Sequence, residues 1–345
     1  MQVSEHVPLA PYTTFGIGGP ARWFIEASFE DEVLEAVHFS REQNERLFVL
    51  GGGSNLLVSD AGFPGVVLHI ALRGVEQHIS EDITKFSVAA GEDWNAFVNL
   101  AVKQNCGGIE CLAGIPGSVG GTPVQNVGAY GQEVSETIRL VRALDLETLR
   151  FVELTTAECG FAYRRSIFNT TSRNRYIVTR VEYGLKNNVP ATISYADLKQ
   201  YFQNKTTPPS LAEAASAVRE IRSRKGMLIV FGDPDCRSAG SFFKNPVISV
   251  DHFAQIVAHA NSTSVPHYPA ADGQVKVPAA WLLDQAGFHK GYVFGRAGIS
   301  SKHTLALINR GEASAADIAA LRDAITARVE EKFAIHLEPE PVWVG

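Results

Sequence analysis

The sequence predicts an α+β protein of two or three domains, and three observations lead to this prediction. The chain has 345 residues, of which 45% are hydrophobic, so it can bury a sizeable core. Apolar strands alternate with helical segments near the N-terminus, whereas residues 138–183 are rich in strands. A helical segment begins at residue 211, and this change of character indicates a separate domain.

The individual elements follow from apolar periodicity and from capping residues. Two helices begin with the pattern of a capping box, Ser28 with Asp31 and Ser314 with Asp317. The side chains that these helices turn inward are expected to be Val33, Leu34 and Val37 in the first and Ile318, Leu321, Ile325, Val329 and Phe333 in the last. Other helices are expected over residues 93–104 and 211–225. Expected strands cover residues 21–25, 47–50, 56–58, 86–91, 140–144, 150–154 and 176–183. The proline-rich tail 337–345 is expected to be a strand or an extended arm.

One uncharged stretch, residues 114–130, dominates the middle of the chain. It holds five glycines, a sixth follows at Gly131, and no charged side chain occurs before Glu133. Glycine lets the backbone approach a ligand, and successive amides can form a concave nest for phosphate oxygens. The alternative is a glycine-rich crossover that packs two elements closely, and this stretch alone does not decide between them.

A second uncharged glycine loop, Gly-Gly-Gly-Ser-Asn at residues 51–55, lies between the apolar strands 47–50 and 56–58. Two such loops after strands suit a long ligand with a central diphosphate, such as a dinucleotide cofactor. Neither loop has the Rossmann spacing, and no Gly-Lys-Ser/Thr phosphate loop occurs. A different fold must therefore hold the cofactor.

Composition excludes several classes of function. A net charge of −6 and a pI near 5.9 argue against a general nucleic-acid or anionic-membrane binder. No apolar run reaches the ~18 residues that span a bilayer, and the first residues lack a secretory signal, so we expect a cytoplasmic protein. The four cysteines form no paired motif and the ten histidines no ligand motif, so we expect free thiols and no metal site.

Three polar segments remain as candidates for chemistry. Ser241 lacks the nucleophile-elbow pattern and a recognisable His-Asp pair, so it is either a supported proton donor or a structural serine. Arg164 stands in a mixed apolar and cationic segment, and taken alone it would be a surface arginine. The cations of residues 219–225 form either a solvated face that complements the helix dipole or a positive rim for an anionic substrate.

Seven motifs occur in order along nearly the whole chain. They are Thr-Phe-Gly-Ile-Gly-Gly at residues 14–19, the loop 51–55, Ile-Pro-Gly-Ser-Val-Gly at 115–120, Gln-Asn-Val-Gly-Ala-Tyr-Gly at 125–131, Tyr-Arg-Arg-Ser at 163–166, Gly-Ser-Phe-Phe-Lys-Asn-Pro at 240–246 and Leu-Glu-Pro-Glu at 337–340. Any one motif is weak, but seven in order are highly specific. Together they resemble the UDP-N-acetylenolpyruvoylglucosamine reductase family, in its first type, which has a tyrosine loop.

The resemblance implies a two-lobed FAD-binding domain of the vanillyl-alcohol-oxidase type and a separate α+β substrate-binding domain. The expected parts are residues 1–72 and 73–210 as the two lobes, with an FAD-binding unit at about 16–187, residues 211–335 as the substrate-binding domain, and residues 336–345 as a C-terminal arm that carries Glu340.

The same resemblance implies NADPH-dependent reduction of UDP-N-acetylenolpyruvoylglucosamine to UDP-N-acetylmuramate for peptidoglycan synthesis. The family holds FAD non-covalently and passes hydride from the reduced flavin to the enolpyruvyl double bond. The positions that match its FAD contacts are Gly51, Gly52, Gly53, Ser54, Asn55, Ile115, Pro116, Gly117, Ser118, Val119, Gly120, Asn126, Gly128, Ala129 and Val178.

Three residues inherit catalytic roles from the resemblance, with Ser241 as the proton donor and Arg164 and Glu340 beside it. Hydride addition leaves negative charge on the adjacent carbon and its carboxylate, which a planar guanidinium can stabilise. Ser241 would then protonate the enolate carbon. Glu340 is preferred to Glu338 because it takes the second glutamate position of Leu-Glu-Pro-Glu.

Six positions match the substrate contacts of the family. Tyr195 resembles the tyrosine loop that folds over bound substrate and excludes water. Two departures affect this match: a longer stretch replaces the usual Leu-Pro-Asp-Pro after Lys225, and Pro341 follows Glu340. The six positions are Tyr195, Lys225, Asn245, Tyr268, Lys276 and Gln285.

Two other functions remain open. A flavin oxidase of the same cofactor fold would oxidise an alcohol or sugar with oxygen, but such enzymes often tether flavin through His or Cys, and residues 51–55 contain neither. A nucleotide-sugar-binding or regulatory protein that has lost its flavin is disfavoured by the retained glycine loops and Ser241. For the reductase we expect small-molecule partners, no nucleic acid, no membrane and a monomer.

Overall fold

The computed structural model describes residues 1–230, 232–259 and 265–345. Its elements group into two units. The first comprises Met1–Val7, Ala21–Gly53 and Phe63–Leu228, and the second comprises Pro8–Pro20, Ser54–Gly62 and Ile229–Gly345. The glycine loop 51–55 is therefore divided, because Gly53 ends a segment of the first unit and Ser54 begins a segment of the second.

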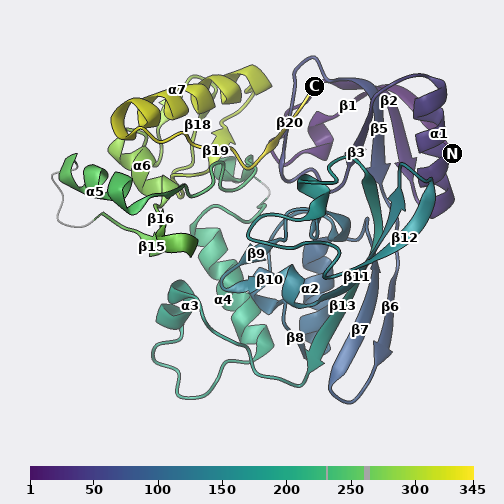
Figure 1. Ribbon diagram of the computed structural model, residues 1–345, viewed down its shortest axis with the longest axis horizontal. Helices are drawn as coiled ribbons and strands as arrows, with labels where there is room; N and C mark the ends of the chain where they lie inside the picture. Colours follow the sequence, from purple (N-terminus) through teal and green to yellow (C-terminus); the bar gives the residue numbers. More distant parts are fainter. Residues whose placement is uncertain (231, 260–264) are drawn as a thin grey trace. The chain divides into compact units, whose positions relative to one another are not determined.

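The strands of the first unit form two sheets and the β9–β10 hairpin (Figure 1). Their bounds are β1 Val3–Pro8, β2 Pro20–Ala27, β3 Leu47–Leu50, β5 Phe63–Ile70, β6 Val75–Ile79, β7 Ile83–Ala89, β8 Cys106–Gly107, β9 Gly128–Ala129, β10 Gln132–Glu133, β11 Ile138–Asp145, β12 Arg150–Thr155 and β13 Tyr176–Asn187. One sheet has the order β1-β2-β5-β3, with β2 and β3 parallel to β5. The other, antiparallel, has the order β12-β11-β13-β7-β6, and β8 pairs with the end of β13.

The helices of this unit are α1 Glu30–Glu42, α2 Trp94–Lys103, α3 Ala196–Tyr201 and α4 Leu211–Arg224. Both sheets share one apolar core with α1, α2 and α4. At its centre, Trp94 is buried and its indole N–H donates to the Leu112 carbonyl at 3.2 Å, while the rings of Phe97 and Tyr183 lie 5.0 Å apart. A buried indole needs such an acceptor to offset its desolvation.

The start of α1 differs from the sequence prediction. Phe29 precedes the helix without any capping side chain, and the Ser28 amide donates to the Glu32 carboxylate at 2.8 Å. The predicted Ser28–Asp31 capping box is therefore wrong, because a carboxylate one residue further on accepts the amide. Glu30 instead accepts hydrogen bonds of 2.9 and 3.0 Å from Arg142, which fixes the helix start to β11.

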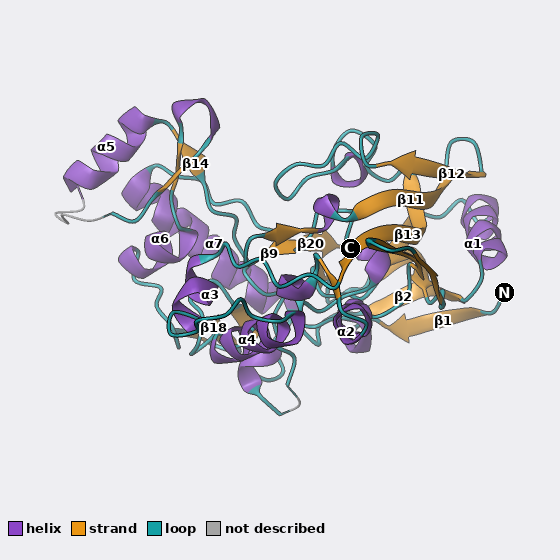
Figure 2. Ribbon diagram, turned by 90° about the horizontal axis from the view of Figure 1, so that it is seen from below, coloured by secondary structure: helices purple, strands orange, loops and turns teal. Residues whose placement is uncertain are grey.

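The second unit contains short strands and longer helices, as the colouring of Figure 2 shows. Its strands are β4 Leu56–Val58, β14 Val247–Ile248, β15 Tyr268–Pro269, β16 Val275–Lys276, β17 Val293–Phe294, β18 Ala297–Ile299, β19 Leu307–Asn309 and β20 Val342–Val344; its helices are α5 Val250–His259, α6 Ala279–Gln285 and α7 Ala315–Phe333. They form the sheets β14-β16-β15, β17-β18-β19 and β20-β4.

Helix α7 and the C-terminal tail confirm their predictions. The Ser314 hydroxyl accepts from the Asp317 amide, and the Asp317 carboxylate accepts from the Ser314 amide, so the capping box is present. All five predicted inward residues of α7 are buried. The tail forms β20, which pairs in parallel with β4 and begins opposite Leu56. All seven strands expected from the sequence are also present.

The four cysteines are free, as expected, and the structure shows that all four are buried. Burial raises the pKa of the Cys111 and Cys159 thiols to about 12, so neither is a reactive thiolate near neutral pH. Within the described part of the chain, no helix combines the length and hydropathy of a membrane span, and no three His, Cys, Asp or Glu side chains gather as a metal site would need.

Candidate active site

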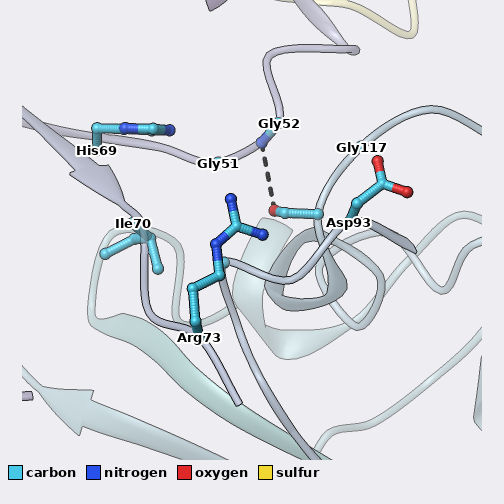
Figure 3. A pocket seen from close by; sticks show the side chains of 9 residues that line it. Gly51, Gly52, His69, Ile70, Arg73, Asp93 and Gly117 are labelled. Carbon is cyan, nitrogen blue, oxygen red and sulfur yellow. Dashed lines mark hydrogen bonds between the residues drawn. The ribbon is translucent and has the colours of Figure 1, made fainter. Parts of the chain in front are cut away.

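The two glycine loops meet within the first unit. The Gly52 amide donates to Ser118 Oγ at 3.2 Å, and a Cβ atom on Gly52 would lie only 2.6 Å from Gly117 Cα. A larger residue at position 52 would therefore force the loops apart. Together they line a cavity of about 140 Å³, here called the glycine cavity (Figure 3). Its lining residues are Gly51, Gly52, His69, Ile70, Arg73, Gly91, Asp93, Gly117 and Ser118.

Arg73 supplies a positive charge to the glycine cavity. Its guanidinium points toward the Gly51–Gly52 pair, and its Nη1 atom lies 3.6 Å from Glu92 Oε2 (Figure 3). The other charged lining residue, Asp93, accepts from the Ala96 amide at 2.7 Å and thereby caps α2. Backbone glycines beside a cation form an environment suited to phosphate oxygens.

Another part of the glycine stretch serves close packing, the alternative that its sequence left open. A Cβ atom on Gly120 would lie 2.6 Å from Ala90 Cβ. The amides of Val119 and Gly120 donate to the carbonyls of Glu92 and Ala90 at 2.9 and 2.8 Å. Residues 117–118 of the stretch therefore line the cavity, while residues 119–120 join it to neighbouring backbone.

Arg164 lies on a tight turn of the first unit. Its backbone adopts a left-handed conformation, with φ of 55°, and its carbonyl accepts from the Asn169 side chain at 3.1 Å. The guanidinium lies 5.4 Å from the ring of Tyr163, and Nη1 is 3.4 Å from the position that a Cβ atom on Gly128 would occupy. Arg164 thus passes over β9, which carries two of the predicted FAD contacts.

Asn126 holds this region together. Its amide nitrogen donates to Glu133 Oε2 at 2.8 Å and to the Ala162 carbonyl at 3.1 Å, and its Oδ1 accepts from the Ser135 amide at 3.1 Å. The side chain is buried and links the β9–β10 hairpin to the turn that carries Arg164. These three bonds give Asn126 a structural role.

Two of the predicted substrate residues meet at Tyr130 in the first unit. The rings of Tyr195 and Tyr130 lie 5.5 Å apart in an edge-on arrangement, and Lys225 Nζ is 6.0 Å from the Tyr130 ring centroid. Lys225 Nζ also lies 2.6 Å from Asp197 Oδ2. Burial alone lowers the pKa of Lys225, but the bond to Asp197 and the two tyrosines outweigh burial and raise it, so the ammonium remains charged.

The cationic segment 219–225 is not entirely a solvated face. Arg222 is 6% exposed, and its guanidinium donates to the carbonyls of Gly114 and Met227 at 3.2 and 2.8 Å. The solvated-face interpretation is therefore wrong for Arg222, because this residue ties the end of α4 to the start of the glycine stretch.

In the second unit, the segment that carries Ser241 pairs with the segment that carries Glu340. The Glu340 amide donates to the Phe242 carbonyl at 2.8 Å, and the Lys244 amide donates to the Glu338 carbonyl at 2.9 Å. Ser241 is partly buried, and its Oγ atom lies 3.1 Å from His303 Nε2. The serine therefore has a titratable partner that no sequence pattern indicated.

Asn55 is bonded to the same C-terminal arm. Its side-chain amide donates to the Glu340 carbonyl at 3.2 Å, and its own carbonyl accepts from the Val342 amide at 2.9 Å. A predicted cofactor residue and a predicted catalytic residue are thus adjacent in the second unit.

Three predicted substrate residues gather on one small sheet of the second unit. Tyr268 and Lys276 are directly opposite each other in β15 and β16, and Tyr268 is exposed. Asn245 precedes β14 and accepts from the Ala279 amide at 2.9 Å, at the start of α6. Gln285 ends α6, so it lies about 9 Å along the helix from Ala279.

Comparisons with known proteins cover the whole chain. Residues 233–344 match the family model "UDP-N-acetylenolpyruvoylglucosamine reductase, C-terminal domain", and residues 21–150 match the model of an FAD binding domain. The UDP-N-acetylenolpyruvoylglucosamine reductase of Thermobifida fusca is 45% identical over 99% of this chain and 98% of its own, and that of Streptomyces coelicolor is 45% identical over 100% and 91%.

The chain belongs to the UDP-N-acetylenolpyruvoylglucosamine reductase family. A solved structure agrees with this assignment. The crystal structure of the Thermus caldophilus reductase matches with a TM-score of 0.66 and 28% identity, covering 100% of both chains.

The fold class and the cofactor predicted from the sequence are confirmed for this reductase-family chain. Its first unit contains most of the matched FAD-binding domain, whose residues 54–62 fall in the second unit, and the second unit contains the reductase-specific C-terminal domain. The protein is an FAD flavoprotein. The glycine cavity fits the diphosphate of FAD, because Gly52 and Gly117 allow the two loops to approach and Arg73 contributes a cation.

Sequence reasoning missed three residues at these positions. Arg73 follows β5, Asp197 is the second residue of α3, close to Tyr195, and His303 lies 62 positions beyond Ser241. Arg73 and His303 belong to no motif quoted from the sequence, and Asp197 lies in the tyrosine-loop segment 194–198 without an assigned role. Only Asp197 had a local signal, since a carboxylate two residues from a predicted substrate tyrosine could pair with a neighbouring lysine.

Proposed function

We propose that this chain reduces UDP-N-acetylenolpyruvoylglucosamine to UDP-N-acetylmuramate, a precursor of peptidoglycan, with NADPH as the electron donor. The observation that carries this proposal is the 2.8 Å hydrogen bond between the Glu340 amide and the Phe242 carbonyl. It holds the proton-donor candidate Ser241 and the carboxylate candidate Glu340 on paired segments, in a chain that belongs to the reductase family throughout its length.

The proposed FAD contacts supply mainly backbone and small side chains. Gly51 to Asn55, Ile115 to Gly120, and Gly128 with Ala129 bind the cofactor, and Val178 of β13 contributes apolar contact. Asn126 acts through the backbone that it fixes. When bound, FAD supplies the hydride chemistry that connects NADPH to the enolpyruvyl double bond.

The protein's own part in the reaction is to manage charge and a proton. Hydride addition at the terminal carbon leaves an enolate on the neighbouring carbon and its carboxylate. The planar guanidinium of Arg164 stabilises that charge, and the Ser241 hydroxyl gives its proton to the carbon. Preorganised donors of this kind accelerate reactions by roughly 10²–10³-fold.

Glu340 rather than Glu338 is the proposed third catalytic residue. The Glu338 carboxylate forms an ion pair with Lys244 and is 68% exposed, whereas Glu340 is partly buried in the arm bonded to Asn55. The role of Glu340 is to orient or polarise the groups around the developing enolate.

Substrate recognition is proposed for Tyr195, Lys225, Asn245, Tyr268, Lys276 and Gln285. Lys225 keeps a charged ammonium despite the altered stretch that follows it, which includes Phe231, a residue outside the described ranges. Tyr195 and the short helix α3 form the tyrosine segment that covers bound substrate.

We retain the division of function inferred from the sequence, with FAD-binding lobes at residues 1–72 and 73–210, a substrate-binding domain at residues 211–335 and a catalytic arm at residues 336–345. The proposed enzyme works in the cytoplasm as a monomer and needs no nucleic-acid or membrane partner. Its partners are its small-molecule substrates.

The test is the stoichiometry of turnover with purified protein. We expect one NADPH oxidised per enolpyruvyl substrate consumed, with a product heavier by two hydrogens in mass spectrometry and no hydrogen peroxide. Formation of hydrogen peroxide in an amount equal to the alcohol or sugar oxidised would show that the protein is an oxidase and not a reductase. Protein that binds the UDP-sugar without flavin would instead support the binding protein.

A further inference from the structure

We propose that His303 is a positioning residue for Ser241, holding its hydroxyl for proton transfer and returning a proton to it after each turnover. This inference rests on the proposed role of Ser241 as the proton donor. Its geometric basis is the 3.1 Å separation of Ser241 Oγ and His303 Nε2, a distance at which a hydrogen bond forms.

The loop that carries His303 is fixed by its neighbours. The amide and hydroxyl of Ser301 donate to the Asp235 carboxylate at 2.9 and 2.7 Å, and Lys302 forms an ion pair with Asp233. The His303 carbonyl accepts from the Ala306 amide at 3.1 Å. Charge-assisted bonds on one side of the histidine and a backbone turn on the other limit its movement.

The serine side of the pair is fixed as well. The Phe242 amide donates to the Leu305 carbonyl at 2.8 Å, so the backbones following Ser241 and His303 are bonded directly to each other. The Phe242 ring is buried and packs edge-on against Phe243, with ring centroids 5.2 Å apart. A hydroxyl and an imidazole held on two cross-linked segments are preorganised for transfer between them.

Proton balance explains why Ser241 needs a partner. As the carbon–hydrogen bond forms, the Oγ–H bond breaks, and the serine would be left as a strongly basic alkoxide. If the imidazolium of His303 passes its Nε2 proton to Oγ, the serine returns to its neutral form and the imidazole becomes neutral. A proton taken up from solvent then returns the imidazole to its charged form. Histidine suits this task because its ordinary pKa, ~6.5, lies near physiological pH.

Charged groups of both signs lie on the segments of the second unit around the pair. Asp284 of α6 accepts from the hydroxyl of Thr304, the residue that follows His303, at 3.4 Å. The charged residues on these segments are Asp233, Asp235, Arg237, Lys244, Asp284, Lys302, Glu338 and Glu340.

The kinetic test compares His303→Ala, Ser241→Ala and the double variant in the FAD-loaded enzyme. We expect His303→Ala to slow flavin reoxidation by the enolpyruvyl substrate about 10- to 100-fold, below the ~10²–10⁴-fold typical of a full acid–base group. NADPH-driven flavin reduction should change less than about twofold. Because His303 acts through Ser241, adding His303→Ala to Ser241→Ala should cost less than about twofold more. Independent, multiplicative losses would overturn the proposal.

A conservative variant of His303 distinguishes proton transfer by its imidazole from a purely structural role. His303→Gln keeps a hydrogen-bond donor but cannot titrate, so it should restore part of the rate while removing the corresponding limb of the pH profile of reoxidation. An unchanged pH profile in His303→Gln would contradict the proposal. His289→Gln, at an exposed histidine of the same unit, is the matched control and should match the parent enzyme.

A measurement without turnover separates this inference from the proposed function. In NMR spectra of the FAD-loaded protein, the His303 imidazole signals, assigned with His303→Gln, should shift and titrate differently in Ser241→Ala. His303 signals that are the same in Ser241→Ala as in the parent protein would refute the coupling between the two side chains. Failure of the substrate to reoxidise reduced wild-type flavin would refute the proposed function instead, whatever the NMR result.

Discussion

The Glu340 amide donates a hydrogen bond of 2.8 Å to the Phe242 carbonyl, which pairs the C-terminal arm with the segment that carries Ser241. Asn55 extends this arrangement, because its side chain donates to the Glu340 carbonyl at 3.2 Å. A residue of the first glycine loop, the candidate carboxylate and the candidate proton donor thus lie on segments linked by hydrogen bonds. Changes at any of them should alter the substrate half of the reaction.

Ser241→Ala should separate the two half-reactions. The proton is needed only when substrate is reduced, so NADPH should bleach the flavin at nearly the normal rate while reoxidation by substrate falls by about 10²–10⁴-fold. Stopped-flow absorbance under anaerobic conditions measures both steps. Equal slowing of both would remove Ser241 from the role of proton donor.

Arg164→Lys should lower turnover by about 10- to 100-fold. The charge remains, but the planar fork that can engage a carboxylate with two hydrogen bonds is lost. Steady-state kinetics with saturating NADPH provide the measurement. Arg165→Lys, at the exposed neighbouring position, is the control and should retain normal kcat. Equal behaviour of the two variants would place Arg164 outside the site.

Gly52→Ala should yield protein with little or no flavin. The added Cβ atom would lie 2.6 Å from Gly117 Cα, so one of the two loops has to move away. The ratio of flavin absorbance to protein absorbance after purification reports the effect. Gly121→Ala is the control, because its Cβ atom would meet only Ser118 Oγ, at an ordinary 3.9 Å. Full flavin content in Gly52→Ala would contradict the role of the glycine cavity.

Glu30→Gln should destabilise the first unit in a pH-dependent manner. Burial raises the pKa of Glu30, but hydrogen bonds from Arg142 and Thr179 outweigh burial, and the net pKa lies below its ordinary value of 4.5. A carboxylate whose pKa is lowered by folding stabilises the folded state fully when the pH is above its pKa in the unfolded chain. This stabilisation is lost as the pH falls through its pKa in the folded protein. We therefore expect a loss of about 1–3 kcal/mol in the free energy of unfolding at pH 7.

Urea unfolding at several pH values checks this prediction. The difference between Glu30→Gln and the parent should be constant at neutral pH and shrink as pH falls below 4.5. Glu42→Gln, at an exposed position in the last turn of α1, is the control. A difference that persists at low pH would mean that packing, rather than the charged pair, fixes α1 to β11.

Much of the fold could be predicted because its signals are local. The Ser314–Asp317 capping box and the apolar period of α7 occur within one helix, and both were correct. The Ser28–Asp31 box failed because another local partner, Glu32, was available for the same amide. Competition between two adjacent carboxylates for one amide is not visible in a pattern.

The candidate site could be predicted only where residues belong to contiguous motifs. The glycine loops and Ser241 occur in such motifs, so they could be recognised as candidate site residues from the sequence. Arg73, Asp197 and His303 are single residues in loops or at a helix start, and tertiary folding alone brings each to its partner. Their spacing along the chain carries no periodic signal.

The central claim is tested most directly by the visible spectrum of the purified protein under anaerobic conditions. Addition of NADPH should bleach the flavin band, and subsequent addition of UDP-N-acetylenolpyruvoylglucosamine should restore it without oxygen. Restoration only when oxygen is admitted would contradict the account and identify an oxidase. A protein with no flavin band at all would contradict the interpretation of both glycine loops.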